Sequence, residues 1–215
     1  VIGQRNVRRK RMPGLAHTLI FFGFLAVQPH SLELMVKGVC PAFEIGHLAP
    51  ALYGGFLFVA DILASFVLVG LAYALYRRLL VRPKYLTMGM DANLIIMFTS
   101  LIIITFQFIN AFQTLLPQPE GFSYAGVFPV SALLVSIFDL RSLSAAHILL
   151  GYEISYWVHM ATIIGFLIYI PGSKHLHLLA AVPNVYLKPL EREKAIEKTD
   201  LEDEEAETYG LGRVN

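Results

Sequence analysis

The sequence predicts an all-α integral membrane protein, a helical bundle of four transmembrane helices with one interfacial segment. Three observations predict it. Of the 215 residues, 56% are hydrophobic and 15% are charged, whereas soluble domains carry about 25% charged residues. Nine of the sixteen acidic residues fall between Glu191 and Glu207, so the rest of the chain is poorer in charge still. Four apolar runs reach the length of about 20 residues that crosses a bilayer core.

The four predicted spans cover residues 14–36, 48–76, 92–116 and 147–170. The last span is expected to continue as helix past Pro171 to about residue 181. A fifth apolar stretch, residues 124–138, contains Gly126 and Pro129 and is short for a span, so it predicts an interfacial or re-entrant piece. We expect the whole segment from 117 to 146 to lie along the outer surface of the bundle.

The basic residues indicate the orientation of the spans. They cluster before the first span and between the second and third. With four spans every basic cluster falls on one side of the membrane, whereas five spans would put the charged tail on the opposite side. The positive-inside rule therefore favours four spans with both termini in the cytoplasm. We expect the cytoplasmic (inner) membrane of a prokaryote.

The chain divides into three predicted parts. Residues 1–12 are a basic cytoplasmic segment, 13–183 a transmembrane domain, and 184–215 an acidic cytoplasmic tail or linker. The chain starts with Val1 rather than methionine, so processing or a longer parent protein is expected. The net charge of +1 gives no basic field, so no nucleic-acid partner is expected. The lone Cys40 cannot by itself form a disulfide or hold an iron–sulfur cluster.

Histidines within the spans are the candidate cofactor ligands, because ionisable side chains in a bilayer are costly. His159 and His177 are 18 residues apart, which is five helical turns and places them on one helix face. His17 lies near the cytoplasmic start of the first span, at the same depth as His177. Two neutral imidazoles on opposite sides of a haem iron make a six-coordinate electron-transfer centre. The spacing therefore predicts that His17 and His177 hold a haem b at the cytoplasmic side.

A second haem is predicted between His30 and His159, which lie at matching depths toward the outer side. His17 and His30 are 13 residues apart, a rotation of about 220°, so they share a face only if the proline before His30 changes the phase of the helix. His47 and His147 are alternatives to His30. A single haem, held by His17 and His177, also stays open.

Three stretches of sequence carry a family resemblance: PGLAHTLIFFGFL (13–25), YALYRRLLVRPK (73–84) and, above all, YWVHMATIIGFLIYIPGSKHLHLLAAVPNVYL (156–187). They resemble the cytochrome b domain of membrane-bound heterodisulfide-reductase-like iron–sulfur oxidoreductases, including the electron-transfer-flavoprotein:menaquinone oxidoreductases. That domain is similar to the gamma subunit of respiratory nitrate reductase. The resemblance covers residues 3 to about 187 and implies that His17 and His177 are inner-haem ligands and His159 an outer-haem ligand. The nitrate reductase subunit has its second first-helix histidine where this chain has Val27.

The resemblance implies part of a quinone-linked oxidoreductase, in which haem b passes electrons between a cytoplasmic iron–sulfur or flavoprotein partner and menaquinone. The [4Fe–4S] clusters are expected on an adjoining domain or subunit, and an electron-transfer flavoprotein is a further expected partner. The direction of electron flow is left open. The alternative is a haem-free membrane anchor or small transporter, in which the histidines pack or relay protons.

Other polar residues in or beside the spans have predicted roles. Glu153 is the candidate relay for the protons that quinone reduction takes up. Arg77, Arg78 and Lys174 are candidates to pair with haem propionates, although anchoring at the positive side of the membrane explains them equally well. Asp61, near the middle of the second span, is expected to be a hydrogen-bonded packing residue.

Overall fold

The computed structural model describes residues 11–83 and 89–173, and six single positions between 176 and 187. Residues 2–176 form one compact unit, and residues 177–215 belong to a second with Val1. In the second unit, Tyr186 and Leu187 are exposed. Lys174, His177 and most of the predicted 1–12 and 184–215 segments lie outside the described residues.

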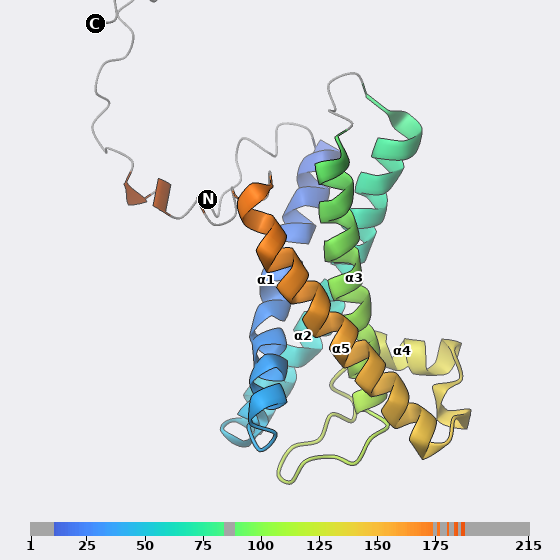
Figure 1. Cartoon of the computed structure of the whole chain (residues 1–215). Coiled ribbons are helices and arrows are strands. Elements are labelled where there is room, and N and C mark those ends of the chain that lie inside the picture. Colours follow the sequence, from blue (N-terminus) through green and yellow to red (C-terminus); the bar gives the residue numbers. More distant parts are fainter. Residues whose placement is uncertain are drawn as a thin grey trace, which may run out of the picture. The chain divides into compact units, whose positions relative to one another are not determined.

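Four long helices make up the first unit, and by length and composition each can cross a membrane. They are α1 (Arg11–Val39), α2 (Pro50–Tyr76), α3 (Met90–Gln113) and α5 (Ala145–Tyr169) (Figure 1). The shorter elements are η2 (Ile45–His47), the π-helical turn η3 (Arg77–Val81), α4 (Pro129–Ile137), η4 (Leu140–Ser142) and η5 (Ile170–Gly172). No strand occurs among the described residues. The predicted all-α fold with four membrane-length helices is confirmed.

The helices begin where the local sequence favours a first turn. α2 and α4 start at Pro50 and Pro129, whose missing N–H groups cost nothing because the first N–H groups of a helix have no partner within it. α5 starts after Ser144, whose hydroxyl accepts a hydrogen bond from the backbone N–H of His147. Each start therefore follows from residues next to it in the sequence.

The end of α5 corrects one expectation. The helix was expected to run through Pro171 to about residue 181, but it ends at Tyr169 and the chain continues in the 3₁₀ turn Ile170–Gly172. Pro171 has no N–H to donate to the preceding turn and its ring crowds that turn, so the α-helical ladder stops there. The predicted continuation of α5 as an α-helix through Pro171 is therefore wrong, and His177 lies outside the described residues.

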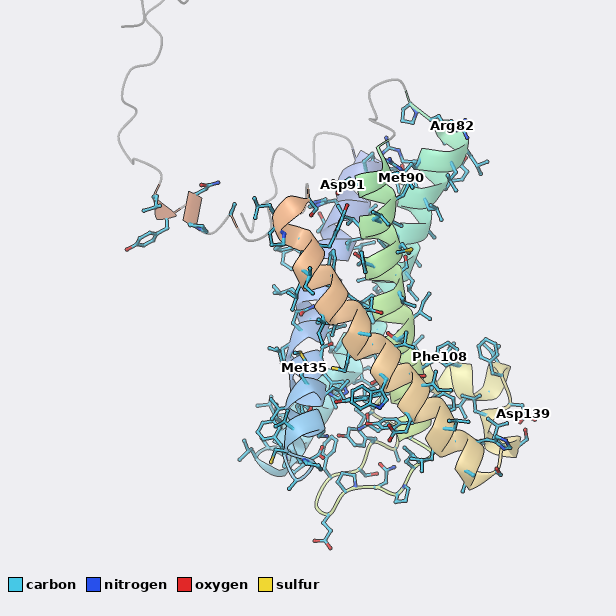
Figure 2. The ribbon with its side chains drawn as sticks, in the orientation of Figure 1. Met35, Arg82, Met90, Asp91, Phe108 and Asp139 are labelled. Carbon is cyan, nitrogen blue, oxygen red and sulfur yellow. The ribbon has the colours of Figure 1, made fainter. Side chains whose placement is uncertain are left out.

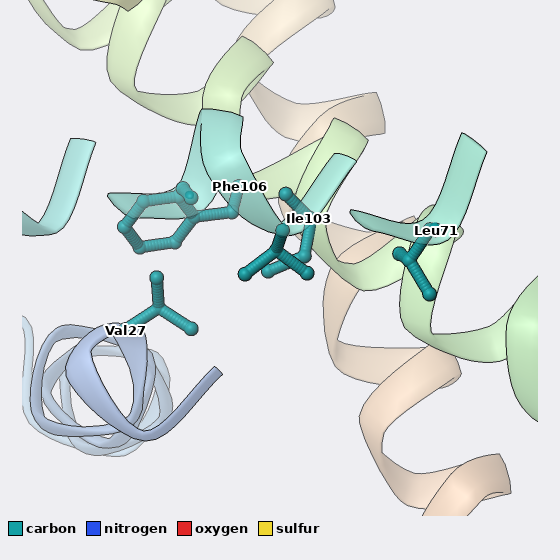
Figure 3. Packing of buried hydrophobic residues seen from close by; sticks show 6 residues of the cluster. Val27, Leu71, Ile103 and Phe106 are labelled. Carbon is teal, nitrogen blue, oxygen red and sulfur yellow. The ribbon is translucent and has the colours of Figure 1, made fainter. Parts of the chain in front are cut away.

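The long helices pack in neighbouring pairs. α1 contacts mainly α2, α5 contacts mainly α3, and α2 contacts α3. Buried side chains from α1, α2 and α3 fill the centre, among them Val27, Leu71, Ile103 and Phe106 (Figure 3). The start of α1 and the end of α5 lie at the same end of the bundle (Figure 1). Asp91 lies at that end and Asp139 at the opposite end (Figure 2).

Glycines allow α1 and α2 to approach closely. A Cβ atom added to Gly23 of α1 would lie 2.4 Å from Val67 Cγ2 and 2.8 Å from the carbonyl oxygen of Leu63. A Cβ atom on Gly70 of α2 would lie 2.9 Å from Ile20 Cγ1. Small residues at such contacts let membrane helices gain packing energy that the lipid does not supply. The α1–α2 contact therefore depends on these two glycines.

We expect Gly23→Ala to destabilise the bundle by about 1–3 kcal/mol, because the Leu63 backbone cannot move away from the added methyl group. Thermal unfolding in detergent measures the effect. Gly55→Ala is the matched control, since nothing lies within 4 Å of a Cβ atom added there and alanine favours a helix. Equal melting temperatures for the two variants would contradict the close α1–α2 contact.

The short helix α4 is docked on α2 and α3 through one buried carboxylate. Asp61 of α2 accepts hydrogen bonds from the backbone N–H groups of Val130 (2.7 Å) and Ser131 (3.1 Å), in the first turn of α4. The Ser131 hydroxyl lies 2.5 Å from Asp61 Oδ1 and 2.7 Å from Gln107 Oε1 of α3. A carboxylate satisfies the unpaired N–H groups at a helix N-terminus. These contacts confirm the expectation that Asp61 packs through hydrogen bonds.

Candidate functional site

Two buried histidines, one on α1 and one on α5, pack against the same aromatic ring of α3. His30 of α1 and His159 of α5 are both 0% exposed. The Phe106 ring of α3 contacts both imidazoles, with ring centres 5.7 Å from His30 and 6.4 Å from His159. Ser31 Oγ lies 3.3 Å from His159 Nε2. The structure thus brings together the two residues that the sequence paired at the outer side.

The contacts of His159 indicate which ring nitrogen carries the proton. Nδ1 lies 3.1 Å from the carbonyl oxygen of Ile102, which can only accept, so Nδ1 is the donor. Nδ1 is also 2.9 Å from Thr105 Oγ1, whose own hydroxyl donates to the Leu101 carbonyl at 2.7 Å. In this tautomer Nε2 keeps its lone pair, and the Ser31 hydroxyl at 3.3 Å is a long contact for it.

The contacts of His30 lead to the same tautomer. Nδ1 lies 3.0 Å from Glu33 Oε2 and 2.9 Å from the Tyr53 hydroxyl. A carboxylate accepts hydrogen bonds, so Nδ1 carries the proton and Nε2 keeps its lone pair. Within the described part of the chain, His30 Nε2 is buried and has no hydrogen-bond partner. A buried polar atom in this state costs about 1–3 kcal/mol unless a ligand satisfies it.

Glu33 connects His30 to a charged cluster at the end of α1. Its second oxygen, Oε1, accepts a hydrogen bond from the backbone N–H of Ile45 at 3.0 Å and lies 3.5 Å from Lys37 Nζ. Lys37 Nζ also lies 2.9 Å from Glu44, and the Tyr124 hydroxyl donates to Glu44 at 2.6 Å. Burial and the neighbouring Glu44 carboxylate raise the pKa of Tyr124 above its usual value, so its hydroxyl stays protonated as a donor.

The donor set of this pair is two imidazoles. His30 and His159 each donate to an acceptor through Nδ1; Nε2 of His30 has no hydrogen-bond partner in the described part of the chain, and Nε2 of His159 lies 3.3 Å from the Ser31 hydroxyl. A histidine that ligates a metal typically donates its other N–H in this way, which fixes the tautomer and the ring orientation. Among the described residues, no group of three or more histidine, cysteine, aspartate or glutamate side chains is placed to hold a metal ion. Two imidazoles are the ligands that a six-coordinate haem takes from its protein.

The other predicted histidines lie apart from this pair. His17 is exposed near the start of α1, toward the opposite end of that helix from Glu33. His147 is exposed, and its Nδ1 lies 2.8 Å from Ser144 Oγ at the start of α5. His47 belongs to η2, but its side chain, like all of His177, lies outside the described residues.

The predicted propionate partners lie at the end of the bundle where α2 leads into α3. Arg77 is half-buried, with its guanidinium carbon 5.9 Å from the centre of the Tyr73 ring. Arg78 is buried and donates to the Asn93 side chain and to the backbone carbonyl just before α3. Arg78 therefore ties η3 to the start of α3. Lys174 lies outside the described residues.

The structure does not bring Glu153 into the histidine cluster. Its side chain is exposed in the first half of α5, whereas His159, six residues later, is buried on another face of the same helix. Six residues rotate a helix by about 240°, which accounts for the two different surroundings.

Sequence reasoning missed the residues that orient the two imidazoles, namely Glu33, Tyr53 and Thr105. The sequence does contain a signal for Glu33. It follows His30 by three residues, and residues at that spacing are neighbours on a helix. Tyr53 and Thr105 lie on other helices, so no local pattern links them to a histidine. Asn110, one turn after Phe106, was also missed; both its side-chain polar atoms are buried without a partner in the described part of the chain.

Comparisons with known proteins identify relatives for the whole chain. It is 29% identical over 214 residues to the "Probable iron-sulfur-binding oxidoreductase FadF" of Bacillus subtilis, covering 100% of this chain and 29% of that protein. It is 26% identical over 219 residues to the "EtfAB:quinone oxidoreductase" of Syntrophomonas wolfei, covering 98% of this chain and 30% of that protein. No family model and no solved structure matches the chain. The chain is thus similar to less than a third of each of these two oxidoreductases.

Proposed function

We propose that this chain is a cytochrome b domain that carries electrons through the membrane. It would exchange electrons with an iron–sulfur domain or subunit on the cytoplasmic side and with menaquinone in the membrane. An electron-transfer flavoprotein is the proposed electron partner of the iron–sulfur part. The membrane would be the cytoplasmic membrane of a prokaryote, with both termini of the chain on its inner side.

One observation carries the proposal: the buried His30 has an Nε2 lone pair without a partner in the described part of the chain, near His159, whose Nδ1 likewise donates to an acceptor. His30 and His159 would hold the haem iron through their Nε2 atoms. When bound, the haem supplies a one-electron carrier inside the bilayer. Glu33 and the Ile102 carbonyl hold the two rings in the ligating tautomer, while Phe106 and Phe128 keep water away from His30.

The relatives support the proposed partners. One is named for binding iron–sulfur groups, and the other for linking EtfAB to quinone. The described part of this chain has four membrane-length helices, and its sequence has a single cysteine, Cys40, so the [4Fe–4S] clusters would belong to an adjoining domain or subunit. The apolar helices would supply the route by which a membrane quinone reaches the domain.

We also propose an inner haem, which His17 and His177 would hold. The candidate partners of its propionates are Arg77, Arg78 and Lys174. His17 lies on the same end of the bundle as Arg77 and Arg78, because α1 begins where α2 ends. Glu153 is the proposed proton carrier for quinone chemistry, since a carboxylate exposed at the outer half of α5 can exchange protons with a ligand in the membrane.

A reduced-minus-oxidised absorption spectrum, with pyridine haemochrome quantification against protein, tests the proposal. We expect two b haems per chain in protein extracted from membranes in folded form. One haem per chain would still support electron transfer. A folded sample without haem would contradict the proposal and favour the haem-free anchor or transporter.

A further inference from the structure

Glu33 is an unusual residue for the interior of a membrane bundle, because it is a carboxylate with almost no exposed surface. Three donors surround its two oxygens: the imidazole N–H of His30, the backbone N–H of Ile45 and the ammonium group of Lys37. A buried charge without partners is strongly destabilising, whereas this set of donors compensates an ionised carboxylate. Glu33 therefore presents negative charge to the His30 ring.

The two candidate ligands are consequently not equivalent. His30 Nδ1 donates to a carboxylate, whereas His159 Nδ1 donates to the neutral carbonyl of Ile102. A hydrogen bond to an ionised acceptor is stronger than one to a neutral acceptor and draws the N–H proton away from the ring. The Nε2 atom of His30 is then the stronger electron donor of the two toward a metal.

A stronger electron donor stabilises the ferric form of a haem more than the ferrous form, because the ferric iron carries the additional positive charge. Axial ligation and hydrogen bonding around the iron are the means by which a protein sets the redox potential. The negative charge of Glu33 acts in the same direction as the electron donation by the ring, since both favour the oxidised iron. Lys37 and Glu44 form the outer part of the cluster, and neither makes a hydrogen bond to His30 in the described contacts.

We propose that Glu33 is a positioning residue that fixes the His30 imidazole in its ligating tautomer and lowers the redox potential of the haem bound there. The inference rests on the proposed function, because it requires that haem. The redox potential of the outer haem is then set by a contact within α1, between His30 and the carboxylate three residues after it. In a chain with two haems, Glu33 makes their potentials differ.

Redox titration of Glu33→Gln, followed by the b-haem absorption bands, tests this role. We expect full haem content and a higher midpoint potential for one haem only, because glutamine keeps the shape of the side chain but removes its charge. Glu44→Gln is the matched control: it removes a carboxylate from the same cluster, without a contact to His30, and should leave both potentials almost unchanged.

Tyr53→Phe separates the effect of charge from that of packing. It removes a neutral neighbour of the same His30 nitrogen, so its effect on the potential should be smaller than that of Glu33→Gln. If Glu33→Gln does not fold, Glu33→Asp carries the test. It keeps the charge with a shorter reach, and a smaller rise of the same potential is expected.

The outcomes distinguish the two proposals. Absence of haem from the unsubstituted protein would reject the proposed function. Haem-loaded Glu33 variants whose potentials equal those of the unsubstituted protein would overturn the role of Glu33 and leave the cytochrome proposal standing. Equal shifts in Glu33→Gln and Tyr53→Phe would also overturn it, because packing alone would then explain the effect.

Discussion

Replacing His159 with alanine should remove the proposed haem between α1 and α5 and leave any inner haem in place. The buried Nε2 of His159 is one of two proposed axial ligands, and alanine offers neither a ligand nor the ring that faces Phe106. Substitution even of a residue that only orients a ligand typically lowers metal affinity 10–100-fold, so loss of the ligand itself should be larger. Pyridine haemochrome quantification should show the haem-to-protein ratio reduced by about half.

His30→Ala should cause the same loss, and the double variant should lose no more haem than either single variant, because both residues serve one site. His147→Ala is the control, since His147 is exposed at the start of α5 and should keep full haem content. Unchanged haem in both His30→Ala and His159→Ala would show that these residues do not form the site. Additive losses would assign them to separate haems.

Replacing Asp61 with alanine should release α4 from the bundle and destabilise the fold by about 2–6 kcal/mol. The change removes the acceptor for two backbone N–H groups, those of Val130 and Ser131, and each buried group left without a partner costs about 1–3 kcal/mol. Thermal unfolding in detergent measures the stability, and hydrogen exchange of the α4 amides measures the docking. Exchange should accelerate first within residues 130–137.

Asp61→Asn should have a smaller effect, because the amide keeps one acceptor oxygen for the α4 backbone. Ser136→Ala is the matched control on α4, since that hydroxyl is exposed and only contacts the Ala132 carbonyl of its own helix at 3.4 Å. An Asp61→Ala protein with unchanged stability and unchanged α4 exchange would show that other contacts dock this helix.

The spans were predictable because the thickness of the bilayer core sets the length of an apolar run, and that thickness is a property of the lipid rather than of the protein. The four long helices begin and end within a few residues of the predicted limits, and α5 stops at Tyr169 because Pro171 overrides the apolar pattern. The docking of α4 was not predictable, since it depends on Asp61 and Ser131, which are 70 residues apart in the chain.

The candidate site was predictable only in part. The depth of each histidine along its helix paired His30 with His159, and the structure places both beside Phe106. The helical rotation between His17 and His30 predicts that they share a face only if the proline before His30 distorts the helix. α1 instead continues as one helix through Pro29, with His17 exposed and His30 buried, as the ideal rotation requires. Glu33 was missed because a charged residue near a span end looks like an ordinary boundary residue.

The contact between Ser31 of α1 and His159 of α5 joins residues that are 128 positions apart in the chain. The two sides of the site are therefore synthesised at different times. At about 5–20 residues per second, the ribosome needs roughly 6 to 26 seconds to reach His159 after making Ser31. Meanwhile α1 can pair with α2, and His30 can already bind Glu33 and Tyr53, which belong to the same hairpin. One imidazole is thus oriented before the other has been synthesised. Insertion of α5 brings the second ring into place, so a cofactor that requires both rings can be captured only after α5 has been inserted.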